Sequence, residues 1–265
     1  MLEILLKDLF ITATILISST SLFLSDRIEN DDSFLSKDEI MLSFEDTGSF
    51  GHEMGGVTGS INDVKISPGG ELSFMKLLMS GSDYSLTLLS DLKESVEVDV
   101  FNNDYTIGRW VMGIYRLDWG GTNEIVRIKY PIHYIVGKPL TTYGTLPKGK
   151  NGIKECKFVD ASKPTLLNVG THVLKKIETF GKLNFETGLF DFTIGFSIGN
   201  RMVEFKKSSD IGETTTDITN NDARYSLYAF GKDPISPFIG LNYMFRYMEN
   251  NTISTIEGII VYKCD

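Results

Sequence analysis

Apolar and polar residues alternate along several segments of this chain, and this period of two is typical of β-strands with one buried face. The alternating apolar positions are Ile40, Leu42 and Phe44; Val96, Val98 and Val100; Phe190, Phe192, Ile194, Phe196 and Ile198; and Ile239, Leu241, Tyr243, Phe245 and Tyr247. The 25 Gly, 17 Phe and 11 Tyr also favour strands and turns over helices. The sequence therefore predicts a mainly β protein, a β-sandwich or barrel with a few short helices.

Two strand-like segments, 109–119 and 124–136, flank Gly120 and Gly121, and these glycines suit the turn of a β-hairpin. Pro131 lies within the second segment and cannot donate a ladder hydrogen bond. We therefore expect the second segment to lie at a sheet edge near Pro131.

Turn-forming residues dominate between residues 137 and 163, and this stretch is the predicted domain boundary. With the division placed near residue 150, the chain has one β-rich domain over residues 1–150 and a second over residues 151–265. The second domain is predicted to contain a helix over residues 171–180, capped by Thr171 and ended by Gly181. The apolar stripe of this helix would consist of Val173, Leu174, Ile177 and Phe180.

Two shorter helices are predicted in the first domain. Leu72, Met75 and Leu78 have helical spacing, and Asp83 is the predicted N-cap of a second helical segment that follows. Two stretches without a period, the glycine-rich residues 47–60 and the polar residues 206–222, are predicted to be loops.

The stretch from Leu9 to Asp26 carries no charge before its last residue. The residues before it lack the net positive charge of a signal peptide, and the apolar run is too short and too rich in Ser and Thr for a membrane helix. Ile11, Ala13, Ile15 and Ile17 fall on one face of an extended chain, which predicts a structural strand. A targeting segment stays the alternative, and membrane association is not expected.

The net charge of −9, from 26 basic and 35 acidic residues, gives no general attraction to phosphate backbones, so we expect no nucleic-acid partner. The two cysteines, Cys156 and Cys264, are too few for a disulfide framework or a thiolate metal site. We expect two reduced thiols, with a single bridge or an intermolecular bond from Cys264 as the alternatives.

No catalytic or metal-binding motif stands out in the sequence. None of His52, His133 and His172 has a second histidine at metal-ligand spacing, and the acidic turn at residues 26–34 lacks the pattern of a calcium loop. Phosphate-binding and nucleophile-elbow motifs are also missing. We therefore expect no enzyme activity, catalytic residue, cofactor, metal or small-molecule substrate, and we expect His133 and His172 at the surface.

The order of elements in the first 140 residues resembles the tube-type domains of contractile-tail bacteriophage proteins, the tail-tube and baseplate-hub subunits. The segments that carry the resemblance are residues 11–48, which include the strand DEIMLSF, then a loop and a helical region, and the strands around VEVDVF and GIYRLDW. The resemblance implies a structural virion component without catalytic residues, whose subunits join their sheet edges into a homo-oligomeric ring. It also implies other virion structural proteins as partners and assembly of the virion in the host cytoplasm.

Two other functions remain open from the sequence. The segments LFDFTIGFSIG and PFIGLNYMFRY alternate aromatic and small residues, as the strands of an exported or outer-membrane β-barrel protein do. A soluble carbohydrate-binding β-sandwich would instead use exposed aromatic side chains, for which Trp110 and Trp119 are the candidates. Both tryptophans lie in an apolar segment, so we expect them in the core.

Overall fold

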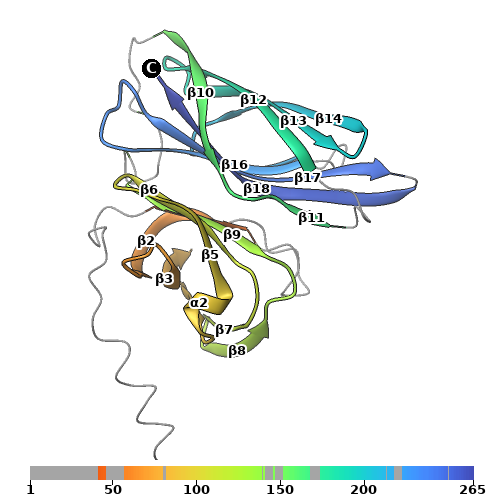
Figure 1. The fold of residues 1–265 in the computed structure, drawn as a ribbon. Helices are drawn as coiled ribbons and strands as arrows, with labels where there is room; N and C mark the ends of the chain where they lie inside the picture. The colour runs from red at the N-terminus through yellow and green to blue at the C-terminus, as the bar shows by residue number, and fades with distance from the viewer. Residues whose placement is uncertain are drawn as a thin grey trace, which may run out of the picture. The chain divides into compact units, whose positions relative to one another are not determined.

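The computed structural model describes residues 41–45, 57–79, 82–138, 140, 146, 152–167, 174–212, 214–217, 223–249 and 251–265 (Figure 1). All the described strands belong to one compact unit, Phe34–Asp265. They form two antiparallel sheets, and the helix α2 (Leu92–Ser95) has only four residues. The prediction of a mainly β protein is confirmed. No helix in the described part of the chain has the length and apolarity needed to cross a lipid bilayer.

The first sheet has the strand order β5-β6-β9-β1-β2-β3-β4-β7-β8. Its strands are β1 (Met41–Glu45), β2 (Val57–Ile66), β3 (Leu72–Met79), β4 (Ser82–Leu88), β5 (Val96–Phe101), β6 (Tyr105–Trp110), β7 (Ile114–Trp119), β8 (Thr122–Arg127) and β9 (Ile132–Gly137). The sheet curls around its own core, because Trp110 Nε1 on β6 donates to Leu72 O on β3 at 2.8 Å. The Leu72 N–H in turn donates to the Tyr134 hydroxyl on β9 at 3.2 Å.

The second sheet has the order β14-β13-β12-β10-β18-β17-β16-β15, with β11 paired to β18. Its strands are β10 (Ile153–Ala161), β11 (Thr165–Leu167), β12 (Leu174–Asn184), β13 (Leu189–Ile198), β14 (Arg201–Asp210), β15 (Thr214–Asp217), β16 (Ala223–Phe230), β17 (Phe238–Glu249) and β18 (Thr252–Cys264). The two edge strands, β14 and β15, are consecutive in the chain. Since Gly212 N–H also donates to Leu227 O on β16 at 2.7 Å, the edges approach each other and the sheet forms a nearly closed barrel.

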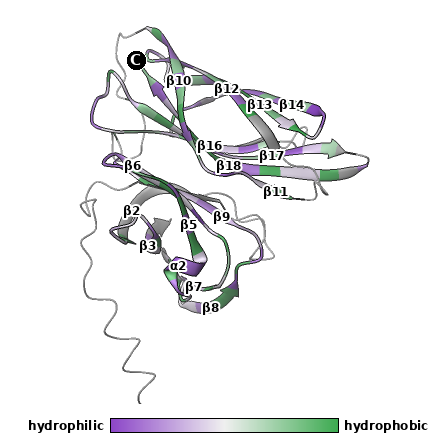
Figure 2. Ribbon diagram, in the orientation of Figure 1, coloured by the Kyte–Doolittle hydropathy of each residue, from purple (hydrophilic) through white to green (hydrophobic). Residues whose placement is uncertain are grey.

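The alternating positions of β13 and β17 face the inside of this barrel. Phe192, Phe196, Leu241, Tyr243 and Phe245 are almost completely buried there. The rings of Tyr243 and Phe245 stack with centroids 5.1 Å apart, and Phe196 contacts Tyr243 at 5.6 Å. The interior is therefore filled by side chains, and Figure 2 shows the matching alternation of hydrophobic and hydrophilic residues along the strands.

The helix predicted at Leu72, Met75 and Leu78 is wrong, because these residues lie in β3. Lys65 pairs with Phe74 while Ile66 pairs with Leu72, so the register shifts by one residue and Ser73 is left over as a β-bulge. The bulge allows Leu72 and Met75, three residues apart, to face the core together, and both are fully buried. A bulged strand thus produces the spacing that we expected from a helix.

The next predicted helix is also wrong over most of its length. Asp83, its expected N-cap, lies in β4, and helix begins only at Leu92. The residue that caps α2 is Asp91, whose carboxylate accepts the Lys93 N–H at 2.9 Å.

The helix predicted over residues 171–180 is the strand β12, at least from Leu174 onward. β12 pairs with β13 along nearly its whole length, and this pairing outweighs the local helical spacing. Ile177 packs against the barrel core, whereas Phe180, three residues later, is 47% exposed on the outer face. The two residues therefore lie on opposite faces of the sheet.

Three other expectations can be compared with the strands. Gly120 and Gly121 have φ values of +56° and +85° between the paired β7 and β8, so the hairpin prediction is confirmed. Pro131 does not mark an edge, because it precedes β9, which pairs with both β1 and β6. The loop predicted over residues 206–222 contains the end of β14 and all of β15.

Several expectations fall on residues outside the described part of the chain. These are the strand at residues 9–26, most of the glycine-rich loop, and Thr171 and Val173. The change from the first sheet to the second lies between Gly137 and Ile153. The division into domains over residues 1–150 and 151–265 stays a prediction.

The outer faces of the two sheets pack on each other through a small apolar cluster. Tyr105, Ile107 and Ile135 come from the first sheet, and the Tyr105 ring meets the Phe230 ring of the second sheet with centroids 5.1 Å apart. Beside this cluster Arg109, 5% exposed, donates from Nη1 to Lys163 O at 2.9 Å and pairs with Glu97. The contact between the sheets thus combines apolar burial with a buried guanidinium whose charge is paired.

His133 of β9 is buried in the same contact. Ile259 N–H donates to Ser162 Oγ at 2.9 Å, so the Ser162 hydroxyl can donate to His133 Nδ1, 3.0 Å away. His133 Nε2 lies 2.8 Å from Thr165 Oγ1. This arrangement fits the neutral imidazole with its proton on Nε2. Burial, assisted by the charge of Arg109, lowers the pKa of His133 from 6.5 to about 3.

The buried imidazole predicts a loss of stability in mild acid. In the unfolded chain His133 is protonated as the pH falls below about 6.5, whereas in the folded protein it stays neutral to about pH 3. The contribution of neutral His133 to the free energy of unfolding is therefore fully present above about pH 6.5 and is lost as the pH falls. The loss amounts to about 2 kcal/mol at pH 5. Urea unfolding of the wild type and His133→Gln at pH 7 and pH 5 measures this. An equal loss in both proteins would contradict the assignment to His133.

Candidate partner-binding surface

The described residues contain no group of three or more His, Cys, Asp or Glu side chains placed to hold a metal ion. His133, expected at the surface, is fully buried, so that expectation is wrong. The reason is the position of β9, a central strand whose outer face the second sheet covers. His52 and His172 lie outside the described residues.

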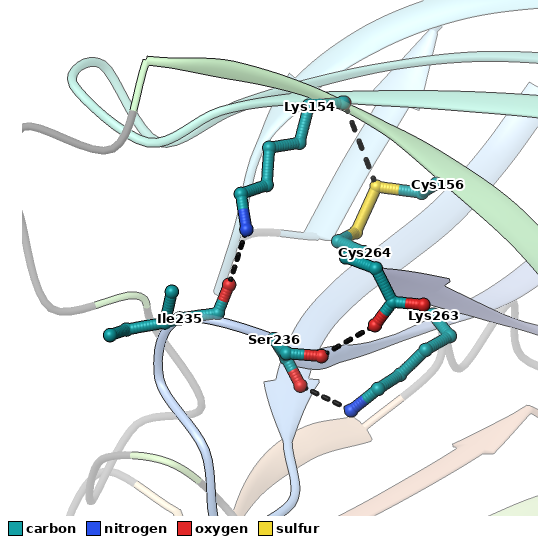
Figure 3. Close-up of a disulfide and its surroundings, with 7 residues drawn as sticks. Lys154, Cys156, Ile235, Ser236, Lys263 and Cys264 are labelled. Atoms are coloured by element: carbon teal, nitrogen blue, oxygen red, sulfur yellow. Dashed lines mark hydrogen bonds between the residues drawn. A yellow bond between two sulfur atoms is a disulfide. The ribbon is translucent and has the colours of Figure 1, made fainter.

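Cys156 and Cys264 form a disulfide, so the expectation of two reduced thiols is wrong (Figure 3). The two residues are 108 positions apart in the sequence but lie directly opposite each other on β10 and β18, with Cα atoms 4.1 Å apart. Both are almost completely buried. Sequence spacing could not reveal this pair, because only the long-range register of the barrel brings the two cysteines together.

Hydrogen bonds surround the disulfide at the end of the barrel where Cys264 lies. Lys154 Nζ donates to Ile235 O at 3.0 Å, and Ser236 Oγ donates to Asp265 Oδ1 at 2.6 Å. Lys263 also donates to Ser236 O (Figure 3). These contacts attach the loop between β16 and β17 to β10 and to the end of β18, which are the first and last strands of this sheet in chain order.

The two tryptophans, both expected in the core, occupy different environments. Trp110 is fully buried and hydrogen-bonded in the first sheet, whereas Trp119 is 53% exposed at the end of β7. Trp119 precedes the Gly120-Gly121 turn, so it lies at the tip of the hairpin beyond the core. The same glycines that predict the hairpin could have placed Trp119 at its tip.

Asp118, which the sequence did not single out, connects three strands next to Trp119. Its carboxylate accepts hydrogen bonds from Asn123 Nδ2 on β8 at 2.7 Å and from Ser85 Oγ on β4 at 3.4 Å. Its Oδ2 also pairs with Arg116 Nε at 3.2 Å. These bonds fix the hairpin against β4 and hold the strand that carries Trp119 in one position.

The strand β8 forms one edge of the first sheet, and five of its six residues are exposed. Ile125 on this strand is 63% exposed, and Ile114 on β7 is 39% exposed. The pairs Ile114–Arg127 and Arg116–Ile125 place the two isoleucines diagonally on the same face. Asp118 pairs with Asn123, so both share the face of the isoleucines, whereas Trp119 lies at the hairpin tip on the opposite face. We call Ile114, Arg116, Asp118, Asn123 and Ile125 on one face, together with Trp119 on the other, the β7–β8 surface.

The β7–β8 surface has the composition of a binding site for another protein. Two isoleucines supply apolar area on one face and Trp119 supplies it at the tip on the other, while Arg116, Asp118 and Asn123 supply polar groups with hydrogen bonds already formed. The outer edge of β8 adds backbone donors and acceptors that pair with no described strand. The surface offers recognition, and no nucleophile or acid–base pair is assembled on it.

No protein-family model matches this sequence, and no curated protein matches it. Similar solved structures include a double mutant of transferrin-binding protein B from Haemophilus parasuis Hp5, with a TM-score of 0.37 and 12% identity over 85% of this chain and 45% of that one. They also include intact Ap-TbpB, with a TM-score of 0.29 and 10% identity over 85% and 46%. Isotype 1 transferrin-binding protein B from serogroup B Neisseria meningitidis has a TM-score of 0.29 and 13% identity over 86% and 43%.

This chain spans less than half the length of each of these three proteins. Identities of 10–13% and TM-scores below 0.4 do not assign it their activity.

The resemblance to contractile-tail phage proteins is wrong. The solved structures that match are transferrin-binding proteins B, not tail-tube or baseplate proteins. The homo-oligomeric ring, the virion partners and the virion localisation inferred from that resemblance are wrong with it. The resemblance depended on a strand, loop, helix and strand order, and the helical region in that order is β3 and β4.

Proposed function

We propose that this chain is an exported protein that acts at the cell surface as a binding protein, with no catalytic activity of its own. The observation that carries the proposal is the buried disulfide between Cys156 and Cys264. Disulfides of this structural kind form and persist in extracytoplasmic compartments and are rare where glutathione and thioredoxin keep thiols reduced. A protein whose first and last barrel strands are joined in this way is suited to an oxidising environment.

The proposed ligand is a folded protein, bound by the β7–β8 surface. Trp119 is the anchor, since tryptophan is among the residues enriched at binding hot spots and this side chain is 53% exposed. Asp118 and its three partners limit the motion of the hairpin, so little conformational entropy is lost when a partner binds. The proteins named above bind transferrin according to their name. For this chain we propose only the class of partner.

Thiol labelling tests the export half of the proposal. Cells of the source organism are quenched in acid, and the denatured protein is treated with a maleimide reagent before and after reduction. We expect no labelled cysteine before reduction and two after it, together with digestion of the protein by protease added to intact cells. Two labelled cysteines before reduction, or complete protection from the external protease, would contradict the proposal.

Substitution of Trp119 tests the binding half. Proteins from the extracellular medium are captured on the immobilised chain and identified, and the strongest ligand is then measured against variants. We expect Trp119→Ala to weaken binding at least about 30-fold, as hot-spot truncations do. The matched control is Phe158→Ala, which removes a similarly exposed aromatic, 49% against 53%, from the second sheet. Equal binding by the two variants would show that the partner uses another surface.

A further inference from the structure

A shallow groove of about 470 Å³ lies on the outer face of β12, β13 and β14, on the second sheet and apart from the β7–β8 surface. The register of the three strands arranges its outward side chains in two neighbouring rows. One row contains Phe180, Thr193 and Lys206, and the next contains Lys182, Asp191 and Ser208. Adjacent strands are about 4.8 Å apart, so each row crosses about 10 Å of the sheet.

The polar groups in the groove are available to a ligand. The side chains of Lys182, Asp191 and Lys206 make no hydrogen bond or ion pair with any described residue, although Lys182 and Asp191 lie opposite each other. All three are exposed, and Phe180 presents its ring at 47% exposure beside them. The ladders from β12 to β13 and from β13 to β14 are nearly complete, so the backbone beneath these side chains is rigid.

The arrangement of these groups matches the chemistry of a sugar. A pyranose ring has an apolar C–H face, which an exposed phenyl ring can cover, and a rim of hydroxyl groups. Thr193, Ser208 and Asp191 can exchange hydrogen bonds with such hydroxyls, and a volume of this size lies within the range of small-ligand sites. Phe192 also lines the groove but is only 1% exposed, so Phe180 supplies the accessible ring, and a protein segment would need more apolar contact than this ring provides.

The two ammonium groups of Lys182 and Lys206 add a preference for negative charge. Together with Lys207 they outnumber the carboxylates of Asp191 and of Glu155, which lies opposite Lys182 on β10. The groove therefore has an excess of positive charge, on a chain whose net charge is −9. A carboxylate on the sugar would therefore form charge-assisted hydrogen bonds here. We propose that the groove on β12–β14 binds a saccharide that carries carboxylate groups, such as a chain of uronic acids.

The test uses two defined probes, a galacturonic acid trimer and the matching neutral galactose trimer, measured by isothermal titration calorimetry with the full chain. We expect the acidic trimer to bind at least tenfold more tightly than the neutral one at low salt, and to weaken as salt is added. Phe180→Ala should weaken the binding of the acidic trimer about tenfold. Lys206→Ala should also weaken it about tenfold and should abolish the preference for the acidic over the neutral trimer. The matched controls are Phe158→Ala on β10 and Lys129→Ala between β8 and β9, which change exposed residues outside the lining of the groove and should leave binding unaltered.

Three results would overturn the proposal. One is the absence of binding by the acidic trimer at millimolar concentration to wild-type protein whose fold is confirmed by circular dichroism. Another is equal binding of the acidic and neutral trimers. The third is tighter binding of a pentaglutamate peptide than of the acidic trimer, with the same dependence on Phe180, which would identify an acidic peptide as the ligand.

Discussion

We expect the double substitution C156A/C264A to lower the free energy of unfolding by about 2–5 kcal/mol. The disulfide joins strands whose cysteines are 108 residues apart, so it removes a large amount of conformational freedom from the unfolded chain. It also connects β10 and β18, which are neighbours in the second sheet and its first and last strands in chain order, so its loss affects the whole barrel. Equilibrium unfolding in guanidinium chloride measures the change as a lower midpoint.

Two comparisons isolate the effect of the covalent bond. Wild-type protein that is unfolded and refolded with a reducing agent present should reach the same midpoint as the double variant. Lys154→Ala leaves the disulfide in place and removes the exposed hydrogen bond to Ile235 O and the contact of Nζ with the Phe185 ring, 5.6 Å from its centroid. It should cost about 1 kcal/mol, less than the loss of the disulfide. An unchanged midpoint in C156A/C264A would mean that the disulfide contributes nothing to stability.

A second large loss is expected from Phe196→Ala, at about 3–5 kcal/mol. Phe196 is completely buried and contacts the rings of Phe205, Tyr243 and Phe245 with centroid distances of 6.1, 5.6 and 6.3 Å. Phe205 lies on β14, the strand paired with β13, and Tyr243 and Phe245 lie on β17, which is not adjacent to β13 in the sheet. All three belong to paired strands, which cannot move inward to fill the cavity.

The control for this prediction is Phe158→Ala. It deletes the same side chain from a position that is 49% exposed, so we expect a loss of less than about 1 kcal/mol. Urea unfolding of both variants at pH 7 gives the comparison. Similar losses at the two positions would show that the barrel interior is loosely packed around residue 196.

Strands with strict alternation could be predicted from the sequence because each of their residues independently reports which face is buried. β5, β13 and β17 were identified in this way, and the hairpin between β7 and β8 by its two glycines. β3 could not be identified, because the bulge at Ser73 changes the phase of its pattern. β12 could not be identified either, because Ile177 and Phe180 are three residues apart and so imitate one face of a helix. In the strand they lie on opposite faces.

The candidate sites were less accessible to sequence reasoning than the strands. Asp118 links the hairpin to β4 because its partners Ser85 and Asn123 come from two other strands. The groove on β12–β14 likewise depends on the strand pairing that places Phe180, Thr193 and Lys206 in one row. Such neighbours are set by strand register, which a single sequence does not specify. The disulfide depends on register in the same way.

The strand order of the second sheet has a consequence for the kinetics of its folding. β12, β13 and β14 form one meander and β16, β17 and β18 another, and within each meander every strand pairs with its neighbour in the chain. The pairing of β18 with β10, and with the short β11, brings together residues roughly one hundred positions apart. The two meanders can therefore form early, while closure of the ladder between β10 and β18 carries most of the entropic barrier. The rate of folding should accordingly be set by the encounter of these two strands.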